Sequence, residues 1–449
     1  MSEEKDLQNT FPHLSRRGFF KGSAALLGGA LISQLPFETN AYARYGADDT
    51  IKVALIGCGG RGTGAAIQAL STQGKVKLVA MADAFRDRLD ESFTAVSTKF
   101  PDKSRFDVPE KNKFIGFDAY KKAIPLADVV ILATPPGFRP IHFEEAVNAG
   151  KHIFMEKPVA TDGPGVRRVL AAAEIAKKKN LNVVVGLQRR YQNAYLETIK
   201  RINDGAIGDI TSAQAYWHNA GVWVRPRKPE QTEMEYQMRN WYYFNWLCGD
   251  HILEQHIHNI DVVNWVKNDY PVSAQGMGGR QVRNGKDHGE IFDHHYVEFT
   301  YADGTIFNSQ CRHQPGTMNR VEEVFVGTKG RVTLSGDGKG IVTDLKGGSI
   351  YNHRSKNDPD PYQTEHDKLF AAIRSGNVIN NAEYGAKSTM TAILGRNATY
   401  SGQVIKWDDA LNTQLSIMPE KFAWDAPTPT KPDANGNYPI PTPGVTRVI

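Results

Sequence analysis

Cysteine is scarce in this chain of 449 residues, where only Cys58, Cys248 and Cys311 occur. Such a small, odd number excludes a disulfide framework, and we expect all three to be small buried residues. Long charged runs of one sign are also missing, the net charge is a modest +5, and no basic run alternates with aromatic residues. These absences argue against a nucleic-acid partner. The rest of the composition, 40% hydrophobic and 23% charged, is that of a globular protein with enough chain for two domains.

Long apolar runs are missing too. The apolar stretch from Gly22 to Leu35 is too short and too rich in glycine to span a bilayer well. It follows Ser15-Arg16-Arg17-Gly18-Phe19-Phe20-Lys21, which has the twin arginine of an export signal, and precedes a small-x-small cleavage sequence, Ala41-Tyr42-Ala43. We expect residues 1–43 to be a twin-arginine signal peptide. The mature protein is then periplasmic or otherwise exported, with no stable membrane span. Twin-arginine export moves folded proteins, so the protein can keep a nucleotide cofactor that it bound beforehand.

A glycine-rich turn follows the first strong strand pattern, Ile51 to Ile56. In a dinucleotide fingerprint, Gly57 makes the tight turn, Gly59 lets the backbone approach the pyrophosphate, and Gly62 lets helix and strand pack closely. The helix that starts here offers free N–H groups to phosphates. An ordinary glycine-rich turn is the alternative. The residues predicted to bind the cofactor in this turn are Gly57, Gly59, Gly60, Arg61 and Gly62.

An acidic residue, Asp83, ends the next strand-like run, 21 residues after Gly62. Its carboxylate can accept hydrogen bonds from the ribose hydroxyls and repel a 2′-phosphate, which favours NAD over NADP. Arg86 lies close enough in sequence to weaken that preference.

The remaining strands of the first half are continuous apolar runs, as buried parallel strands are. Asp128 to Thr134 ends in Pro135-Pro136, and Lys151 to Met155 leads into Glu156-Lys157-Pro158. In doubly wound sheets the carboxyl ends of strands bind ligands, so Thr134, Pro135, Glu156 and Lys157 join the predicted cofactor site. A helix from Gly165 and a strand that ends at Gly186 complete a Rossmann domain over residues 44–186.

Beyond Gly186 the pattern changes to alternating strands, which are typical of an antiparallel sheet. We predict an α/β protein whose second domain, residues 187–423, has an open, mostly antiparallel sheet with helices on one face. Leu253 to Val266 is its strongest predicted helix. The proline-rich residues 424–449 form either an extended arm or a disordered tail. Strands are predicted at Thr211–His218, Tyr296–Thr300, Thr305–Gln310, Arg320–Val326 and Gly330–Ser335.

Together these motifs resemble the Gfo/Idh/MocA oxidoreductases, with Glu156-Lys157-Pro158 after a Rossmann strand as the most specific element. The resemblance also rests on the glycine turn, Ala133-Thr134-Pro135, Val185 to Tyr191, Gly205 to Gly208 and a histidine-bearing helix. It implies a bound NAD(P), a small-molecule carbohydrate substrate, and a homo-oligomer formed through the open sheet. It also makes Lys157 the catalytic lysine, which can polarise the reacting hydroxyl or ketone.

Proton transfer needs a second group, and the resemblance places it on the histidine-bearing helix. There the family has an Asp and a His four residues apart; here Glu254 and His258 hold that spacing, which puts them on one helix face. An imidazole with a pKa near neutrality suits proton transfer. We therefore predict Lys157, His258 and Glu254 as the catalytic residues.

The stretch from Trp217 to Trp246 combines flat aromatic faces with hydrogen-bonding groups, as carbohydrate pockets do. Filling the core or an oligomer interface is the alternative use of these aromatics. The predicted substrate contacts are Arg190, Tyr191, His218, Trp241, Tyr243 and His258.

Zinc is a weaker alternative for the same helix, where His251, Gln255 and His258 share a face. Because the family normally works without metal, we predict no metal ligand.

The expected function is an exported, NAD-dependent oxidoreductase that transfers hydride between the nicotinamide and a secondary hydroxyl or ketone of a sugar or glycoside. The Glu254–Asp261 segment resembles that of enzymes that oxidise glycosides at C3. The alternatives are an NAD-dependent glycoside hydrolase, which uses oxidation, elimination and reduction, and a non-catalytic binding protein of the same fold.

Overall fold

A computed structural model describes residues 49–354 and 357–449, all within one unit of contacting residues. The predicted signal peptide, residues 1–43, lies outside the described residues. Among the described residues, no helix combines the length and the apolar character needed to cross a membrane.

The first half is built on a parallel six-stranded sheet with the strand order β3-β2-β1-β4-β5-β6. All four residues of β4 are buried, because helices cover both faces of the sheet. The strand order reverses between β1 and β4, which places a ligand crevice at the carboxyl ends of these strands. The strands are β1 (Ile51–Ile56), β2 (Val76–Asp83), β3 (Lys113–Ile115), β4 (Val129–Leu132), β5 (His152–Met155) and β6 (Val183–Val185).

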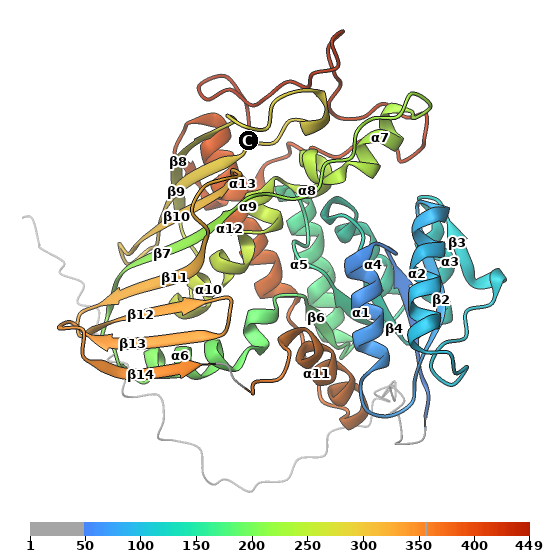
Figure 1. Cartoon of the computed structure of the whole chain (residues 1–449), viewed down its shortest axis with the longest axis horizontal. Helices are drawn as coiled ribbons and strands as arrows, with labels where there is room; N and C mark the ends of the chain where they lie inside the picture. The colour runs from blue at the N-terminus through green and yellow to red at the C-terminus, as the bar shows by residue number, and fades with distance from the viewer. Residues whose placement is uncertain (1–48, 355–356) are drawn as a thin grey trace, which may run out of the picture. The chain divides into compact units, whose positions relative to one another are not determined.

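Helices from this half and one from the far end of the chain cover that sheet (Figure 1). Helix α11 (Pro361–Ser375) packs against α1 and β5, and its apolar residues enter the same core as those of β1. A late segment therefore completes the Rossmann half. The local helices are α1 (Gly60–Leu70), α2 (Arg86–Lys99), α3 (Ala119–Ala123), α4 (Arg139–Asn148) and α5 (Gly163–Lys178).

The second half is built on a nine-stranded sheet with the order β14-β13-β12-β11-β7-β10-β9-β8-β15. Within the described ranges, neighbouring strands run antiparallel except β7 and β10, which confirms the predicted sheet type. Burial alternates along β9 and β10, since one face packs on the core. Strands β8, β13, β14 and β15 were not predicted. The strands are β7 (Ile210–Asn219), β8 (Ser273–Gly279), β9 (His294–Thr300), β10 (Ile306–His313), β11 (Arg320–Gly327), β12 (Gly330–Ser335), β13 (Lys339–Asp344), β14 (Ser349–Arg354) and β15 (Ile405–Lys406).

The longer helices that pack on this sheet are α6 (Asn193–Asn203), α10 (Ile257–Lys267) and α12 (Ala382–Ser401). Helix α12 contacts β8 and β9 on one side and α5 of the first half on the other. One apolar core therefore runs through both halves and fixes the active-site residues that each contributes. The shorter helices are α7 (Glu233–Arg239), α8 (Asn245–Cys248), α9 (His251–Glu254) and α13 (Trp407–Asn412).

Beyond α13 the chain forms an extended arm, with neither helix nor strand in residues 413–449. Two of its aromatic residues pack on loops of the Rossmann half: Trp424 lies 4.6 Å from Phe117 and Phe422 lies 5.1 Å from Phe138, between ring centroids. These aromatic contacts hold the start of the arm against the Rossmann half.

The prediction of one continuous helix over Leu253–Val266 is wrong. The N–H groups of Gln255 and His256 both donate to the carbonyl of His251, at 3.0 and 3.1 Å, so the turn widens and separates α9 from α10. His256 is buried and bonds Ser309 of β10 at 2.8 Å. A wide turn of this kind frees a backbone carbonyl and occurs often at functional sites.

Candidate active site

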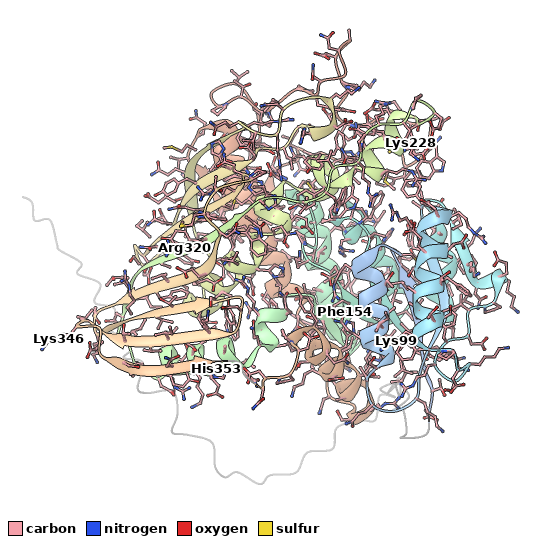
Figure 2. The ribbon with its side chains drawn as sticks, viewed as in Figure 1. Lys99, Phe154, Lys228, Arg320, Lys346 and His353 are labelled. Carbon is pink, nitrogen blue, oxygen red and sulfur yellow. The ribbon has the colours of Figure 1, made fainter. Side chains whose placement is uncertain are left out.

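Two adjoining cavities lie at the carboxyl ends of the parallel strands. Their volumes are about 370 and 1010 Å³, and Arg61, Thr134 and Trp241 are among the residues that line both. The larger cavity receives residues from both halves, such as Lys157 after β5 and Arg320 on β11, the latter labelled in Figure 2. It therefore lies where a cofactor held by one half can meet a substrate held by the other.

The glycine turn lines the smaller cavity and leaves room for a ligand. Gly57 has φ +93°, and a Cβ placed on it would lie 2.5 Å from the backbone of the turn that follows β4. A Cβ placed on Gly62 would lie 1.9 Å from the carbonyl oxygen of Gly57. A Cβ on Gly59 or Gly60 would meet no atom within 4 Å, so the backbone there is open. Helix α1 starts at this point without a side-chain cap or an acidic residue in its first turn. These features fit a dinucleotide pyrophosphate, whose charge favours a helix N-terminus.

Asp83 lies at the end of β2 in the same cavity. Its carboxylate accepts hydrogen bonds from the backbone N–H groups of Cys58 at 2.6 Å and Phe85 at 2.9 Å, which fix its position. Burial raises its pKa, while these two N–H groups oppose the shift. Arg86 is exposed and paired with Asp90 and Glu110, outside the lining of this cavity, so it does not bear on the NAD preference as the sequence suggested.

Arg61 and Glu156, both predicted to bind cofactor, pair with each other. The Arg61 Nε donates to Glu156 at 2.5 Å, and its other nitrogens bond Gln68 at 2.8 Å and the buried Glu365 at 3.2 Å. The pair lies at the boundary of the two cavities, because Arg61 lines both and Glu156 lines the larger. Pro135 lines the smaller cavity, as predicted.

Lys157 is held by the wide turn between α9 and α10. Its Nζ donates to the backbone carbonyl of Glu254 at 2.7 Å and lies 3.4 Å from that residue's carboxylate. In a continuous helix this carbonyl would accept the N–H of His258, which instead bonds Gln255. The break in the helix thus supplies the acceptor that aims the lysine into the larger cavity.

Glu254 and His258 line that cavity although they lie on separate helices, so the prediction of one shared helix face needs correcting. Burial and the nearby Lys157 charge lower the pKa of His258 well below its ordinary value, rather than leaving it near neutrality. Burial raises the pKa of Glu254, opposed by Lys157. The Trp217 indole lies nearly parallel to the His258 ring at 6.2 Å. A buried, uncharged imidazole of this kind can accept a proton.

The predicted substrate contacts divide into two groups. His218, Trp241 and His258 line the larger cavity, whereas Arg190, Tyr191 and Tyr243 line neither cavity. Arg190 makes two bonds of 2.8 Å to the buried Asp261.

The other two residues of the second group also bond elsewhere: the hydroxyl of Tyr191 donates to Asn381 at 2.6 Å, and that of Tyr243 donates to the Val222 carbonyl at 3.3 Å. These three predictions are corrected, since each polar group is already engaged in the fold.

Among the residues of the larger cavity that sequence reasoning missed are Arg139, Arg189 and Tyr362. Arg189 directly precedes Arg190 and pairs with the buried Glu323. The two consecutive arginines in the sequence indicated a polar site, but the ion-pair partner of each arginine lies far away in the sequence. Tyr362 starts α11, far along the chain, and nothing in its neighbourhood marked it.

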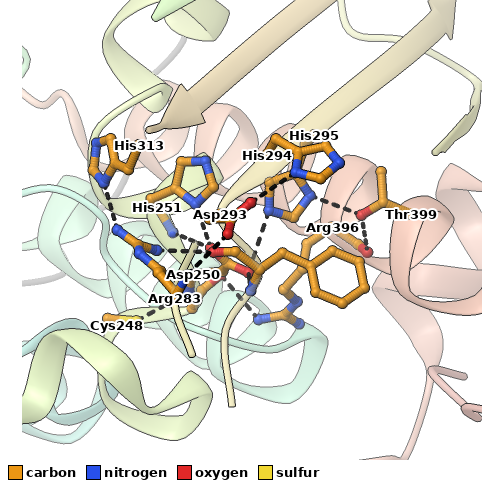
Figure 3. A network of polar contacts seen from close by, with 12 residues as sticks. Cys248, Asp250, His251, Arg283, Asp293, His294, His295, His313, Arg396 and Thr399 are labelled. Carbon is orange, nitrogen blue, oxygen red and sulfur yellow. Dashed lines mark hydrogen bonds and ion pairs between the residues drawn. The ribbon is translucent and has the colours of Figure 1, made fainter. Parts of the chain in front are cut away.

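The zinc alternative concerned the histidine-rich segment, where the structure brings Asp250, His251 and His295 within 4.8 Å of one another (Figure 3). The Asp250 carboxylate accepts bonds from His251, from the Phe292 N–H at 2.9 Å and from the Tyr400 hydroxyl at 2.6 Å. These donors use the oxygens that a metal would need. The group is a buried hydrogen-bonded cluster, and we assign no metal ligand there.

Comparisons with known proteins agree with this geometry. The family described as "Oxidoreductase family, NAD-binding Rossmann fold" matches residues 51–187, and the GFO/IDH/MocA C-terminal domain matches residues 195–333. An inositol 2-dehydrogenase of Agrobacterium fabrum is 28% identical over 311 residues, which cover 66% of this chain and 81% of the relative.

Solved structures show the same fold. An aldose-aldose oxidoreductase from Caulobacter crescentus has a TM-score of 0.62 at 19% identity, covering 80% of this chain and 100% of that one. A scyllo-inositol dehydrogenase from Lactobacillus casei, solved with NAD(H) and scyllo-inositol, has a TM-score of 0.60 at 20% identity, covering 80% and 99%.

Fold and site together define an NAD-binding oxidoreductase that acts on CH–OH groups. The chain belongs to the Gfo/Idh/MocA family.

Proposed function

We propose that this protein transfers hydride between NAD and a secondary hydroxyl or ketone of a sugar or glycoside. The observation that supports it is the meeting of Lys157 and His258 in one cavity that adjoins the glycine-lined cavity. Trp217, Trp241 and His218 in the same lining suit a ring-shaped substrate with many hydroxyls. A relative named inositol 2-dehydrogenase is in keeping with such a substrate.

The residues divide the work of proton transfer and positioning. Bound NAD supplies the acceptor for the hydride that leaves the carbinol carbon. Lys157 donates a hydrogen bond to the substrate oxygen, while the Glu254 carbonyl holds its ammonium in place. His258, uncharged because it is buried, takes the hydroxyl proton. In the reverse direction it returns that proton to the alkoxide.

Within that activity we propose oxidation of glycosides at C3, supported by the sequence of the Glu254–Asp261 segment. The test begins with mass spectrometry of native protein for a co-purified nucleotide. Incubation with a panel of glycosides should then yield products two mass units lighter, and reduction with borodeuteride should place deuterium at C3. Deuterium at another carbon refutes the C3 assignment alone. Free sugar released from an aryl glycoside identifies the hydrolase instead, and binding without any product identifies a binding protein.

Export through the twin-arginine route is also part of the proposal, supported by the residues around Arg16-Arg17. Replacing both arginines by lysine should leave the full-length protein in the cytoplasm on cell fractionation, while wild type is recovered outside it.

We further propose a homo-oligomer that buries the open sheet face. Light scattering of the purified protein tests this, and we expect a particle mass above the 49.8 kDa of one chain.

A further inference from the structure

A segment from the second half lines the smaller cavity. Trp223, Arg225, Arg239 and Trp241 line it together with the glycine turn. The two ends of the segment contact each other, since the rings of Trp223 and Trp241 lie 5.8 Å apart. Its C-terminal end is anchored to the Rossmann half, because the Arg239 guanidinium lies 4.0 Å from the centre of the Phe85 ring after β2. We call residues 221–243 the cover segment.

Four arginines line this cavity, and their partners differ: Arg61 pairs with Glu156 and Glu365, as described above. Arg88 pairs with Glu91 at 2.9 Å, and Arg239 pairs with Asp87 at 3.0 Å and with Glu235 at 2.8 Å. Among the residues that the structure describes, no carboxylate lies within ion-pair distance of Arg225. Arg225 therefore lines the same cavity as the glycine turn without an ion-pair partner of its own.

One contact of its guanidinium group and one hydrogen bond of its backbone hold Arg225 in position. Its guanidinium lies 4.8 Å from the centre of the Trp223 ring, and its backbone N–H donates to the Asn240 side chain at 2.9 Å. Arg225 is exposed, and partial desolvation together with the charges of Arg88 and Arg239 lowers its pKa, while Glu91 and Asp87 oppose the shift. An arginine held in this way is suited to an anion, because its planar fork matches phosphate oxygens.

We propose that Arg225 binds a phosphate group of the dinucleotide and that the cover segment thereby closes the cofactor cavity. The assignment adds a charged contact from the second half to the backbone N–H groups of α1. It rests on the proposed function, since it requires the cofactor to bind in this cavity. The cover segment then controls how fast the cofactor leaves.

The test is a stopped-flow measurement of NADH release from full-length protein, by displacement with excess NAD and loss of nicotinamide fluorescence. Arg225→Gln should release NADH about tenfold faster or more and weaken the salt dependence of binding, while Arg225→Lys should restore part of the loss. Arg227→Gln is the matched control: Arg227 bonds Glu233 at 2.6 Å and does not line the cavity, so release should match wild type. Equal thermal unfolding of the variants confirms that the fold is retained.

NADPH distinguishes which phosphate is bound. An equal loss of affinity for NADH and NADPH in Arg225→Gln assigns the pyrophosphate, and a larger loss for NADPH assigns a 2′-phosphate. An unchanged release rate in Arg225→Gln overturns the proposal. If the wild-type protein binds neither NADH nor NADPH, the proposed function itself is wrong. The wild-type measurement alone shows this, so the two failures can be told apart.

Discussion

At the scale of single residues, the activity depends on two side chains delivered by different halves. Lys157 follows a Rossmann strand, and His258 lies in the first turn of α10, yet both line one cavity. Their polar atoms serve proton transfer and hydrogen bonding to the reacting oxygen, while the glycine turn serves cofactor binding. Losing either side chain should therefore affect chemistry far more than nucleotide binding.

Lys157→Ala and His258→Ala should each lower kcat by about 10²-fold or more, the usual contribution of general acid–base catalysis. NADH affinity, measured by fluorescence titration, should change little. Lys151→Ala, at the opposite end of β5, is the control and should keep wild-type activity. Full turnover in either active-site variant would falsify the assignment.

The acid limb of the pH profile should report the buried environment of His258. Burial and the Lys157 charge disfavour the charged imidazole, so it stays uncharged as pH falls through about 6.5, the ordinary histidine pKa. We expect kcat/KM to hold steady from pH 8 to 6.5 and to fall only at lower pH. Steady-state rates across that range check this, in buffers of constant ionic strength. A midpoint at or above 6.5 would contradict the buried, neutral imidazole.

At the scale of elements, the short helix α9 carries the acceptor for Lys157, and Asp250 fixes where α9 begins. Asp250 has φ +77° and ψ 163°, a conformation that residues other than glycine rarely adopt. Its carboxylate holds this strained backbone by accepting hydrogen bonds from α9, Phe292 and Tyr400 at once. The aim of Lys157 thus depends on a buried cluster outside the cavity.

Asp250→Ala should lower the free energy of unfolding by about 3 kcal/mol or more, because several buried donors lose their acceptor. Urea denaturation measures this. Asp250→Gly removes the same carboxylate but relaxes the backbone, and should recover about 1 kcal/mol of that loss. The exposed Asp337→Ala should stay within about 0.5 kcal/mol of wild type. Equal stability of Asp250→Ala and wild type would show that the cluster contributes nothing.

Local patterns account for most of what the sequence predicted. The glycine turn, Asp83 and Lys157 follow strands whose apolar runs are plain in the sequence, and neighbours in the chain decide their place. The break between α9 and α10 was not predictable, because the groups that bond to it, Lys157 and Ser309, lie far before and far after it in the sequence. Arg189 and Arg190 are equally polar neighbours, and only the distant acids Glu323 and Asp261 decide which of them reaches the cavity.

At the scale of the whole molecule, segments near the C-terminal end of the sequence complete structural units that are built mainly from earlier residues. Helix α11 closes the Rossmann core, α12 joins both sheets, and the extended arm packs behind loops that line the cofactor cavity (Figure 1). The arm has no periodic pattern, so its order comes from contacts that composition does not reveal. Its aromatic residues should therefore contribute measurably to the stability of the whole protein.

Trp424→Ala should lower the free energy of unfolding by about 1–3 kcal/mol, less than for a fully buried tryptophan because this one is half-buried. Val445→Ala, at a position 80% exposed in the same arm, should change it by less than about 0.5 kcal/mol. Chemical denaturation of both variants makes the comparison. Indistinguishable curves would mean that the arm is not part of the cooperative unit.

The late position of the arm sets an order for biosynthesis. Phe117 and Phe138, which form part of the cofactor cavity wall, leave the ribosome some 300 residues before Phe422 and Trp424, which support them from behind. A nascent chain can fold its first strands early, yet this wall lacks its backing until translation is nearly finished. We therefore expect stable loading with nucleotide to follow release of the polypeptide from the ribosome.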